Sequence, residues 1–264
     1  MKTSRLKTIV IVILLLVNVF LLFLLLSRRA EERDSSERRV EQLCTLFEKN
    51  GVSFDRALLP DDETHLSFSL ERDTAREEAF ASALLGTVES SNSGGVSRFT
   101  GEYGSCSILS GGAVDALLSR PVDDPEDFCK QLFKTFGYTQ LTAQIANGSG
   151  SVTGVRCEKE RRIFNATLTL TFSDGSLTGV SGTFLPALDE GRRTDGLDAV
   201  DALVHFLDYC SASGVVCTEV CALDEGYLLQ SSSASPLRVQ SVWRISTDVS
   251  SYYVNCKTGE ITRE

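Results

Sequence analysis

The stretch ATLTLTFSDGSLTGV, Ala166–Val180, decides the fold class. Ala166, Leu168, Leu170 and Phe172 alternate with threonines, which is the two-residue period of a strand with one buried face. The tetrapeptide SDGS that follows Phe172 is a turn signal, and a second apolar run starts immediately after it. The sequence therefore predicts an antiparallel β-hairpin that returns to about residue 185.

Outward from this hairpin, predicted helices and strands alternate. Asp73 and the triplet Asp124-Pro125-Glu126 have the features of helix N-termini, and Gly86, Gly137 and Gly214 are placed to end helices. Further strands are predicted over residues 66–70, 96–109, 215–221, 227–230, 239–247 and 252–256, and loops over residues 90–95 and 147–151. The predicted class is α+β, with two related halves of helix plus antiparallel sheet at residues 43–120 and 121–264.

Before these halves lies an apolar segment, Ile9–Leu26, whose only polar residue is Asn18. A helix of this length spans roughly 27 Å, close to the thickness of the bilayer hydrocarbon. A cleaved signal peptide would carry a small-residue cleavage site, whereas Ser27-Arg28-Arg29 follows here. We therefore expect a single-pass transmembrane anchor at residues 9–26, with a short tail at residues 1–8 and a charged helical stalk at residues 27–42. Val40, Leu43, Leu46 and Phe47 then give the helix an apolar face, and Asn50-Gly51 is expected to end it.

The charges beside the anchor leave its orientation open. Basic residues flank both ends, and counting them alone slightly favours a cytoplasmic C-terminal domain. The arginines after the anchor are offset by acids, whereas the N-terminal tail has none. Acids count for little in this rule, so composition does not fix the topology.

Net charge argues against nucleic-acid binding. The chain has a net charge of -10, and all 36 acidic residues follow residue 29. Such a domain is repelled by phosphate backbones and by anionic lipid. About 235 residues after the anchor are enough for a substantial core.

The inventory of reactive residues predicts no enzyme, no cofactor and no metal site. His65 and His205 lie outside any metal-ligand spacing, and Cys217-x-x-x-Cys221 lacks zinc-ribbon or thioredoxin spacing. No nucleophile elbow, Walker loop or dinucleotide fingerprint is present. The eight cysteines are either buried free thiols or, in an exported domain, partly paired, with a connectivity that the sequence does not reveal.

Two groups of residues are candidates for binding partners. Trp243, Arg244 and Tyr253 lie on predicted strands and either fill the core or anchor a partner surface. In the anchor, the Asn18 amide favours a hydrogen-bonding partner in lipid, and such interhelical bonds contribute about 0.6 to 2 kcal/mol. The helix face around Asn18 includes Ile11, Leu14, Leu15, Leu21, Leu22 and Leu25.

Three parts of the chain resemble the YycI family of membrane-anchored regulatory proteins. They are the ending, Trp243-Arg244-Ile245 with Tyr252–Asn255 and Thr258–Ile261; the middle, Arg162–Asn165 with the hairpin; and the anchor, Lys7-Thr8-Ile9 with Leu16–Leu21. The resemblance covers roughly residues 1–26 and 155–264 and includes no catalytic motif. The eight cysteines and the arginines beside the anchor depart from the family pattern.

The resemblance implies a cytoplasmic N-terminus and an extracytoplasmic α+β domain in the cell membrane of a Gram-positive bacterium. It also implies two partners, a sensor histidine kinase of the YycG (WalK) type in a two-component system and a YycH-like sister protein. The anchor would then pack against kinase transmembrane helices and modulate signalling. The alternative interpretation is an exported PepSY-like binding or protease-inhibitory module, for which the anchor is only a tether.

Overall fold

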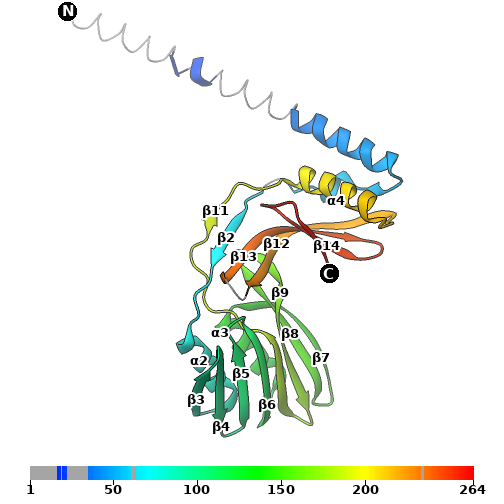
Figure 1. Ribbon diagram of the computed structural model, residues 1–264. Helices are drawn as coiled ribbons and strands as arrows, with labels where there is room; N and C mark the ends of the chain where they lie inside the picture. The colour runs from blue at the N-terminus through cyan, green and yellow to red at the C-terminus, as the bar shows by residue number, and fades with distance from the viewer. Residues whose placement is uncertain (1–16, 19, 23–34, 61–62, 233–234) are drawn as a thin grey trace, which may run out of the picture.

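The chain folds as a mixed α+β structure with a large sheet and few helices (Figure 1). The computed structural model describes residues 17–18, 20–22, 35–60, 63–232 and 235–264. The strands divide into an eight-stranded part and a smaller part, which we name the large lobe and the small lobe. Strand β9 belongs to the large lobe and also pairs with β12 of the small lobe.

The large lobe contains two units, each a helix followed by four antiparallel strands. The first is α2 (Thr74–Leu85), β3 (Val88–Ser93), β4 (Val96–Gly101), β5 (Gly104–Leu109) and β6 (Ala113–Pro121). The second is α3 (Pro125–Phe136), β7 (Tyr138–Ala146), β8 (Ser149–Glu158), β9 (Arg161–Ser173) and β10 (Ser176–Thr183). The last strands of the two units, β6 and β10, pair antiparallel, so the sheet order is β3-β4-β5-β6-β10-β9-β8-β7.

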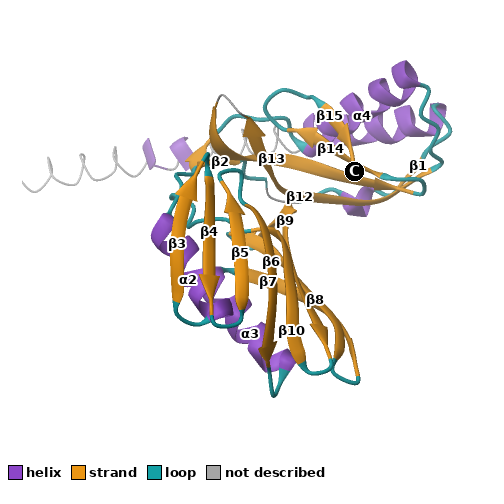
Figure 2. Cartoon of the chain, turned by 60° about the horizontal axis from the view of Figure 1, so that its bottom comes forward, coloured by secondary structure: helices purple, strands orange, loops and turns teal. Residues whose placement is uncertain are grey.

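Both helices of the large lobe lie against the same face of this sheet (Figure 2). Asp73 accepts a hydrogen bond from the Arg76 backbone N–H, and Asp124 caps α3 in the same way. Gly137 ends α3 in a left-handed conformation that a side chain would strain. The predicted starts and ends of these two helices are confirmed.

The small lobe is formed by segments from both ends of the chain, before and after the large lobe in sequence. Its elements are a helix over residues 35–49, β1 (Ser53–Phe54), a 3-10 turn η1 (Arg56–Leu58), β2 (Leu66–Ser69), β11 (Arg192–Arg193), α4 (Ala199–Ser213), β12 (Glu219–Ser232), β13 (Ser235–Thr247), β14 (Ser251–Asn255) and β15 (Ile261–Arg263). Strand β13 pairs with β12 on one side and with β2 and β14 on the other. Helix 35–49 and α4 pack on this sheet (Figures 1 and 2).

Three clusters of buried side chains hold these layers together. One lies under α2 and α3, and a second lies under helix 35–49 and α4. The third combines residues of both lobes: Phe68, Leu70, Ile163, Ala166, Leu185, Tyr227 and Val239. This third cluster forms an apolar joint between the lobes.

The structure confirms the predicted hairpin and corrects two predicted loops. The hairpin at residues 166–180 is formed by β9 and β10, with Asp174 at φ 50° in its turn. Residues 90–93 form part of β3 rather than a loop, and residues 149–151 begin β8. Both segments consist of Ser, Asn and Gly, so their side chains show no alternation that would predict a strand. They are extended because their backbones pair with β4 and β7, respectively.

The predicted boundary between residues 120 and 121 falls at the end of β6, within the eight-stranded sheet. The predicted second half, residues 121–264, contributes α3 and β7–β10 to the large lobe and α4 and β12–β15 to the small lobe. Helices α2, α3 and α4 are each followed by antiparallel strands.

Phe80→Ala is expected to lower the free energy of unfolding of the large lobe by about 3 to 5 kcal/mol. Phe80 is fully buried and stacks on Phe184, with ring centroids 4.4 Å apart, so truncation leaves a cavity between α2 and the sheet. Urea unfolding measures the change. Leu117→Ala is the control, because Leu117 is 71% exposed on the opposite face of the same sheet. Equal shifts for the two variants would contradict this assignment of the core.

Candidate functional sites: a docked helix, an ionic joint and an aromatic patch

Helix 35–49 is docked on the small lobe through one apolar face. Val40, Leu43 and Phe47 are 8%, 2% and 1% exposed. The predicted apolar face also included Leu46, which is 37% exposed instead. Asn50 and Gly51 end the helix as predicted, with Gly51 at φ 72°.

An arginine clamps this helix to the start of α4. Arg39 Nη1 donates to Asp198 Oδ2 at 2.9 Å, and Arg39 Nη2 donates to Asp201 Oδ1 at 2.9 Å. Asp198 is also the N-cap of α4 and accepts the Asp201 backbone N–H. The hydrogen bond and the negative charge of Asp198 raise the pKa of Arg39. The clamp therefore joins two helices that are about 160 residues apart in sequence.

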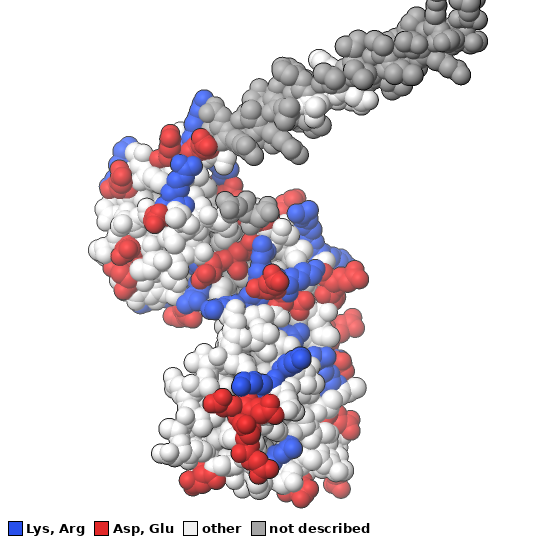
Figure 3. All heavy atoms as spheres, turned by 180° about the vertical axis from the view of Figure 1, so that it is seen from behind, with Lys and Arg blue, Asp and Glu red and all other residues white. Residues whose placement is uncertain are grey.

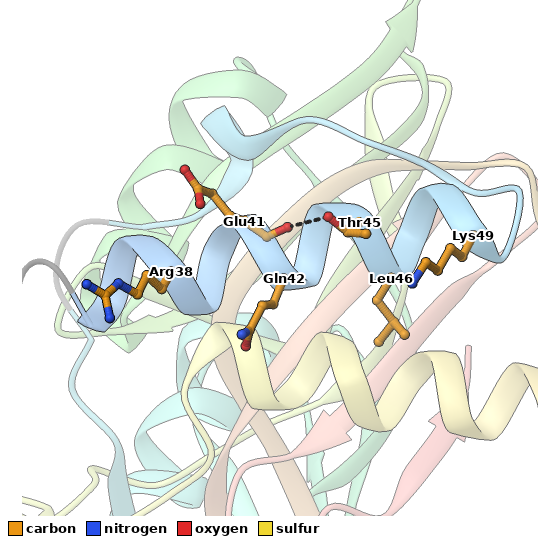
Figure 4. Close-up of a pocket in the computed structure, with 6 residues that line it drawn as sticks. All are labelled: Arg38, Glu41, Gln42, Thr45, Leu46 and Lys49. Carbon is orange, nitrogen blue, oxygen red and sulfur yellow. Dashed lines mark hydrogen bonds between the residues drawn. The ribbon is translucent and has the colours of Figure 1, made fainter.

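The other side of helix 35–49 carries a shallow groove of about 390 Å³ (Figure 4). It is lined by five residues of polar or charged type and one leucine: Arg38, Glu41, Gln42, Thr45, Leu46 and Lys49. Within the lining, the Thr45 hydroxyl donates to the Glu41 carbonyl oxygen at 2.9 Å. The docked helix thus presents a face of mixed charge with one leucine, a composition suited to protein contact.

A buried ionic cluster, here named the ionic joint, connects the two lobes. Arg161, at the start of β9, donates from Nη1 to Glu225 Oε1 on β12 at 2.6 Å and also to the Thr64 carbonyl oxygen. His65 Nδ1 lies 3.3 Å from the same Glu225 oxygen. The Glu225 and His65 side chains are 7% and 9% exposed, so the ion pair between Arg161 and Glu225 is little screened by solvent.

A second carboxylate lies beside the ionic joint. Glu63 accepts the Ala199 backbone N–H at 3.1 Å at the start of α4. Burial raises the pKa of Glu63, and the negative charges of Asp198 and Glu225 act in the same direction. The His65 ring meets Trp243 edge-on at 6.1 Å. Glu63 therefore links the ionic joint to the same helix that Arg39 clamps.

The three residues of the predicted partner surface, Trp243, Arg244 and Tyr253, lie on two different faces of the sheet. Trp243 is fully buried, and its indole N–H donates to the Leu197 carbonyl oxygen at 2.9 Å. Of the two alternatives that the sequence left open for Trp243, it therefore fills the core and is not part of a partner surface. Alternate residues of β13 point to opposite faces of the sheet. Arg244 and Tyr253 are cross-strand partners on the other face.

Arg244 and Tyr253 form an aromatic patch with Phe164 of β9. The Arg244 guanidinium lies 5.5 Å from the Phe164 ring centroid, and the Phe164 and Tyr253 centroids are 5.3 Å apart. Burial raises the pKa of Tyr253 to about 12, aided by Glu264. The patch is partly exposed at Arg244 and Phe164, whereas Tyr253 is 8% exposed. Two of the three predicted residues therefore meet, and Phe164 is the member that the sequence did not reveal.

The predicted anchor lies almost wholly outside the described residues. This applies to Ile11, Leu14 and Leu25, whereas Asn18 and Leu22 are described as helical and exposed. In the part of the chain that the structure describes, no helix has the length and apolarity needed to cross a membrane.

The two histidines occupy different surroundings. His65 belongs to the ionic joint, whereas His205 lies on α4 beside Gly259. Among the described residues, no three His, Cys, Asp or Glu side chains are grouped so that they could hold a metal ion. Cys217 is buried and Cys221 is exposed, so these two thiols lie in different surroundings.

Surface charge is mixed on the face that Figure 3 shows. Lysine and arginine side chains are interspersed with aspartate and glutamate, and acidic groups gather on the large lobe. That face has no continuous basic surface of the kind that nucleic acid requires.

Comparisons with known proteins yield remote structural matches, among them the following two. No protein-family model and no curated protein matches the chain. A crystal structure of an uncharacterized protein from Eubacterium rectale matches with a TM-score of 0.44 and 10% identity over 76% of this chain and 81% of that chain. The Bacillus megaterium YpeB C-terminal domain matches with a TM-score of 0.36 and 15% identity over 74% of this chain and 98% of that chain. Neither score is high enough to assign a family, and the YycI resemblance has no support from a family model.

Glu225→Leu is expected to lower the free energy of unfolding by about 3 kcal/mol, because Arg161 and His65 lose their buried carboxylate. The double variant Arg161→Met/Glu225→Leu should be less destabilised than the sum of the two single variants, since neither charge is then left alone. Urea unfolding of the four proteins measures this coupling. Strict additivity would show that the pair contributes nothing to the joint.

Glu63→Gln is expected to flatten the pH dependence of stability. The folded pKa of Glu63 is raised above its usual 4.5, so its stabilising contribution is complete below that pH and is lost as pH rises through the folded pKa. Glutamine keeps an acceptor for the Ala199 N–H. Unfolding from about pH 4 to about pH 8 tests this. The exposed Glu48→Gln is the control, and identical profiles for all three proteins would contradict the prediction.

Proposed function

We propose that this protein is a membrane-anchored extracytoplasmic binding module that acts through protein contacts rather than catalysis. The observation that carries the proposal is the docking of helix 35–49. Its apolar face is buried on the small lobe, Arg39 fixes it to α4, and its groove stays open. This helix follows the apolar segment Ile9–Leu26 in sequence, so a partner in the groove would be near the membrane.

The first specific version is regulation of a sensor histidine kinase, as the YycI resemblance implies. Residues 1–8 would be cytoplasmic, and residues 9–26 would contact kinase helices through the Asn18 face. A YycH-like protein would bind the ectodomain. The docked helix supports this version, because movement of the small lobe would displace the segment that leads to the anchor. The anchor must contact two kinase states unequally, since equal contact shifts no equilibrium.

The second version is a tethered PepSY-like module that binds a ligand or inhibits a protease. The two helix-plus-four-strand units of the large lobe are consistent with it, because this version expects an exported α+β fold. It gives the anchor no role beyond attachment. The two versions therefore differ in whether the sequence of the anchor and its connection to the small lobe matter.

The experiment compares three changes in the native host by kinase-dependent transcription. Arg39→Glu places an acid against Asp198 and Asp201 and releases helix 35–49. Arg98→Glu, on the exposed face of β4, makes the same charge change elsewhere. The third change replaces residues 9–26 by an unrelated leucine-rich span. Under the kinase version, Arg39→Glu and the anchor replacement reduce signalling by about tenfold, equivalent to about 1.4 kcal/mol of lost coupling.

The outcomes separate the proposals. Transcription that is unchanged by every variant contradicts the kinase version. Retained ligand binding or protease inhibition after anchor replacement then supports the tethered module. Cell fractionation and labelling with a membrane-impermeant thiol reagent at the exposed Cys221 test the placement itself, and labelling only after cell lysis would contradict an extracytoplasmic domain.

A further inference from the structure

Two buried cysteines lie near the C-terminal end of α4. Cys210 is in the last turn of this helix, and Cys217 lies two residues before the start of β12. They are 9% and 7% exposed, and both belong to the buried cluster under α4 that also contains Tyr252. Each thiol is close enough to the other to influence its pKa. Gly214, left-handed at φ 70°, reverses the chain between them. The fold thus brings two thiols that are seven positions apart close together.

Other cysteines have different neighbours. Cys106 lies near Asp115 and Glu77, and Cys129 lies near Glu126. Cys256 lies near Glu225 in the small lobe. Cys221, four positions after Cys217, is exposed. Cys210, and not the exposed Cys221, is therefore the buried neighbour of Cys217.

We propose that Cys210 and Cys217 form a structural disulfide that ties the end of α4 to the start of β12. The oxidant is a protein or small-molecule disulfide of the compartment in which the domain folds. One cysteine thiolate attacks the oxidant disulfide and releases one oxidant thiolate. The second cysteine thiolate then attacks this mixed disulfide, which closes the Cys210–Cys217 bond and releases the other oxidant thiolate. The two protons from the cysteines pass to the two oxidant thiolates, which leave as thiols.

Burial determines when this bond forms. It raises the pKa of Cys210 to about 12 and raises that of Cys217 as well, so both native thiols stay protonated at neutral pH. Since the thiolate is the attacking species, closure takes place while the chain folds and both cysteines are still accessible. Once closed, the bond is shielded by the core under α4 and resists reduction.

The disulfide would stabilise the surface on which helix 35–49 docks. Arg39 holds the N-terminal end of α4, and the disulfide would hold its C-terminal end. Closure in the cell rests on the proposed extracytoplasmic placement, because disulfides persist in oxidising compartments. Pairing during refolding with a supplied oxidant does not depend on that placement.

The test is refolding of the full-length chain in detergent with oxidised and reduced glutathione, followed by unfolding and labelling with N-ethylmaleimide. Trypsin releases one peptide, Thr194–Arg238, that contains Cys210, Cys217 and Cys221, because no Lys or Arg lies between its ends. We expect a single label, located on Cys221 by fragmentation, and a peptide mass about 2 Da lower from loss of two hydrogens. Three labels, a label on Cys210 or Cys217, or a glutathione adduct at either would overturn the proposal.

Thermal unfolding gives a second readout. The oxidised chain should have a Tm about 5 to 10 °C above that of the reduced chain. Cys217→Ser should abolish this difference, and Cys129→Ser, a matched buried thiol in the large lobe, should preserve it. If Cys210 and Cys217 form a disulfide on refolding but are reduced in protein isolated from cells, the result supports the disulfide proposal and contradicts the extracytoplasmic placement. A Tm difference that survives Cys217→Ser would overturn the proposal.

Discussion

The two lobes depend on one strand that belongs to both. Strand β9, Arg161–Ser173, is flanked by β8 and β10 in the large lobe, and its Ile163 also pairs in parallel with Tyr227 of β12. A backbone contact of a single residue pair does not fix two sheets by itself. The apolar joint around Ile163 and the ionic joint at Arg161 surround it and provide the rest. Arg161 and Ile163, two residues apart at the start of β9, therefore contribute to both of the joints that hold one lobe on the other.

The ionic joint contributes specificity more than stability. Burying Arg161, Glu225 and His65 together incurs a desolvation cost that their attraction only partly offsets. Apolar side chains would connect the lobes at least as strongly, but they would tolerate sliding of β9 along β12. A carboxylate that must meet both an arginine and a histidine accepts a single register. Glu63 extends this requirement to the start of α4, because it bonds the Ala199 N–H.

The sequence predicted what depends on local patterns. Helix caps at Asp73 and Asp124, the hairpin around Asp174 and the buried face of residues 40–47 follow from neighbours within a few positions. Strand β3 was missed because its order comes from pairing with β4 and not from its own polar residues. The contacts of Arg39 with Asp198 and of Arg161 with Glu225 join residues 159 and 64 positions apart, and no spacing rule reveals them. The candidate sites were therefore harder to predict than the elements that carry them.

Two kinds of contact hold helix 35–49 on the small lobe: apolar burial supplies most of the binding free energy, and the Arg39 ion pairs fix the position of the helix. Burial of Val40, Leu43 and Phe47 provides about 1.5 to 3 kcal/mol for each side chain, whereas an exposed ion pair provides about 0.2 to 1 kcal/mol. The Arg39 side chain is 47% exposed, so the apolar face supplies most of the affinity of the helix for the small lobe. A helix held by three apolar side chains alone could still rotate or shift by a turn. The two carboxylates at the start of α4 remove that freedom, because only one register places Arg39 between them. The direction in which the helix leaves the domain is thereby fixed by a contact that contributes little to folding.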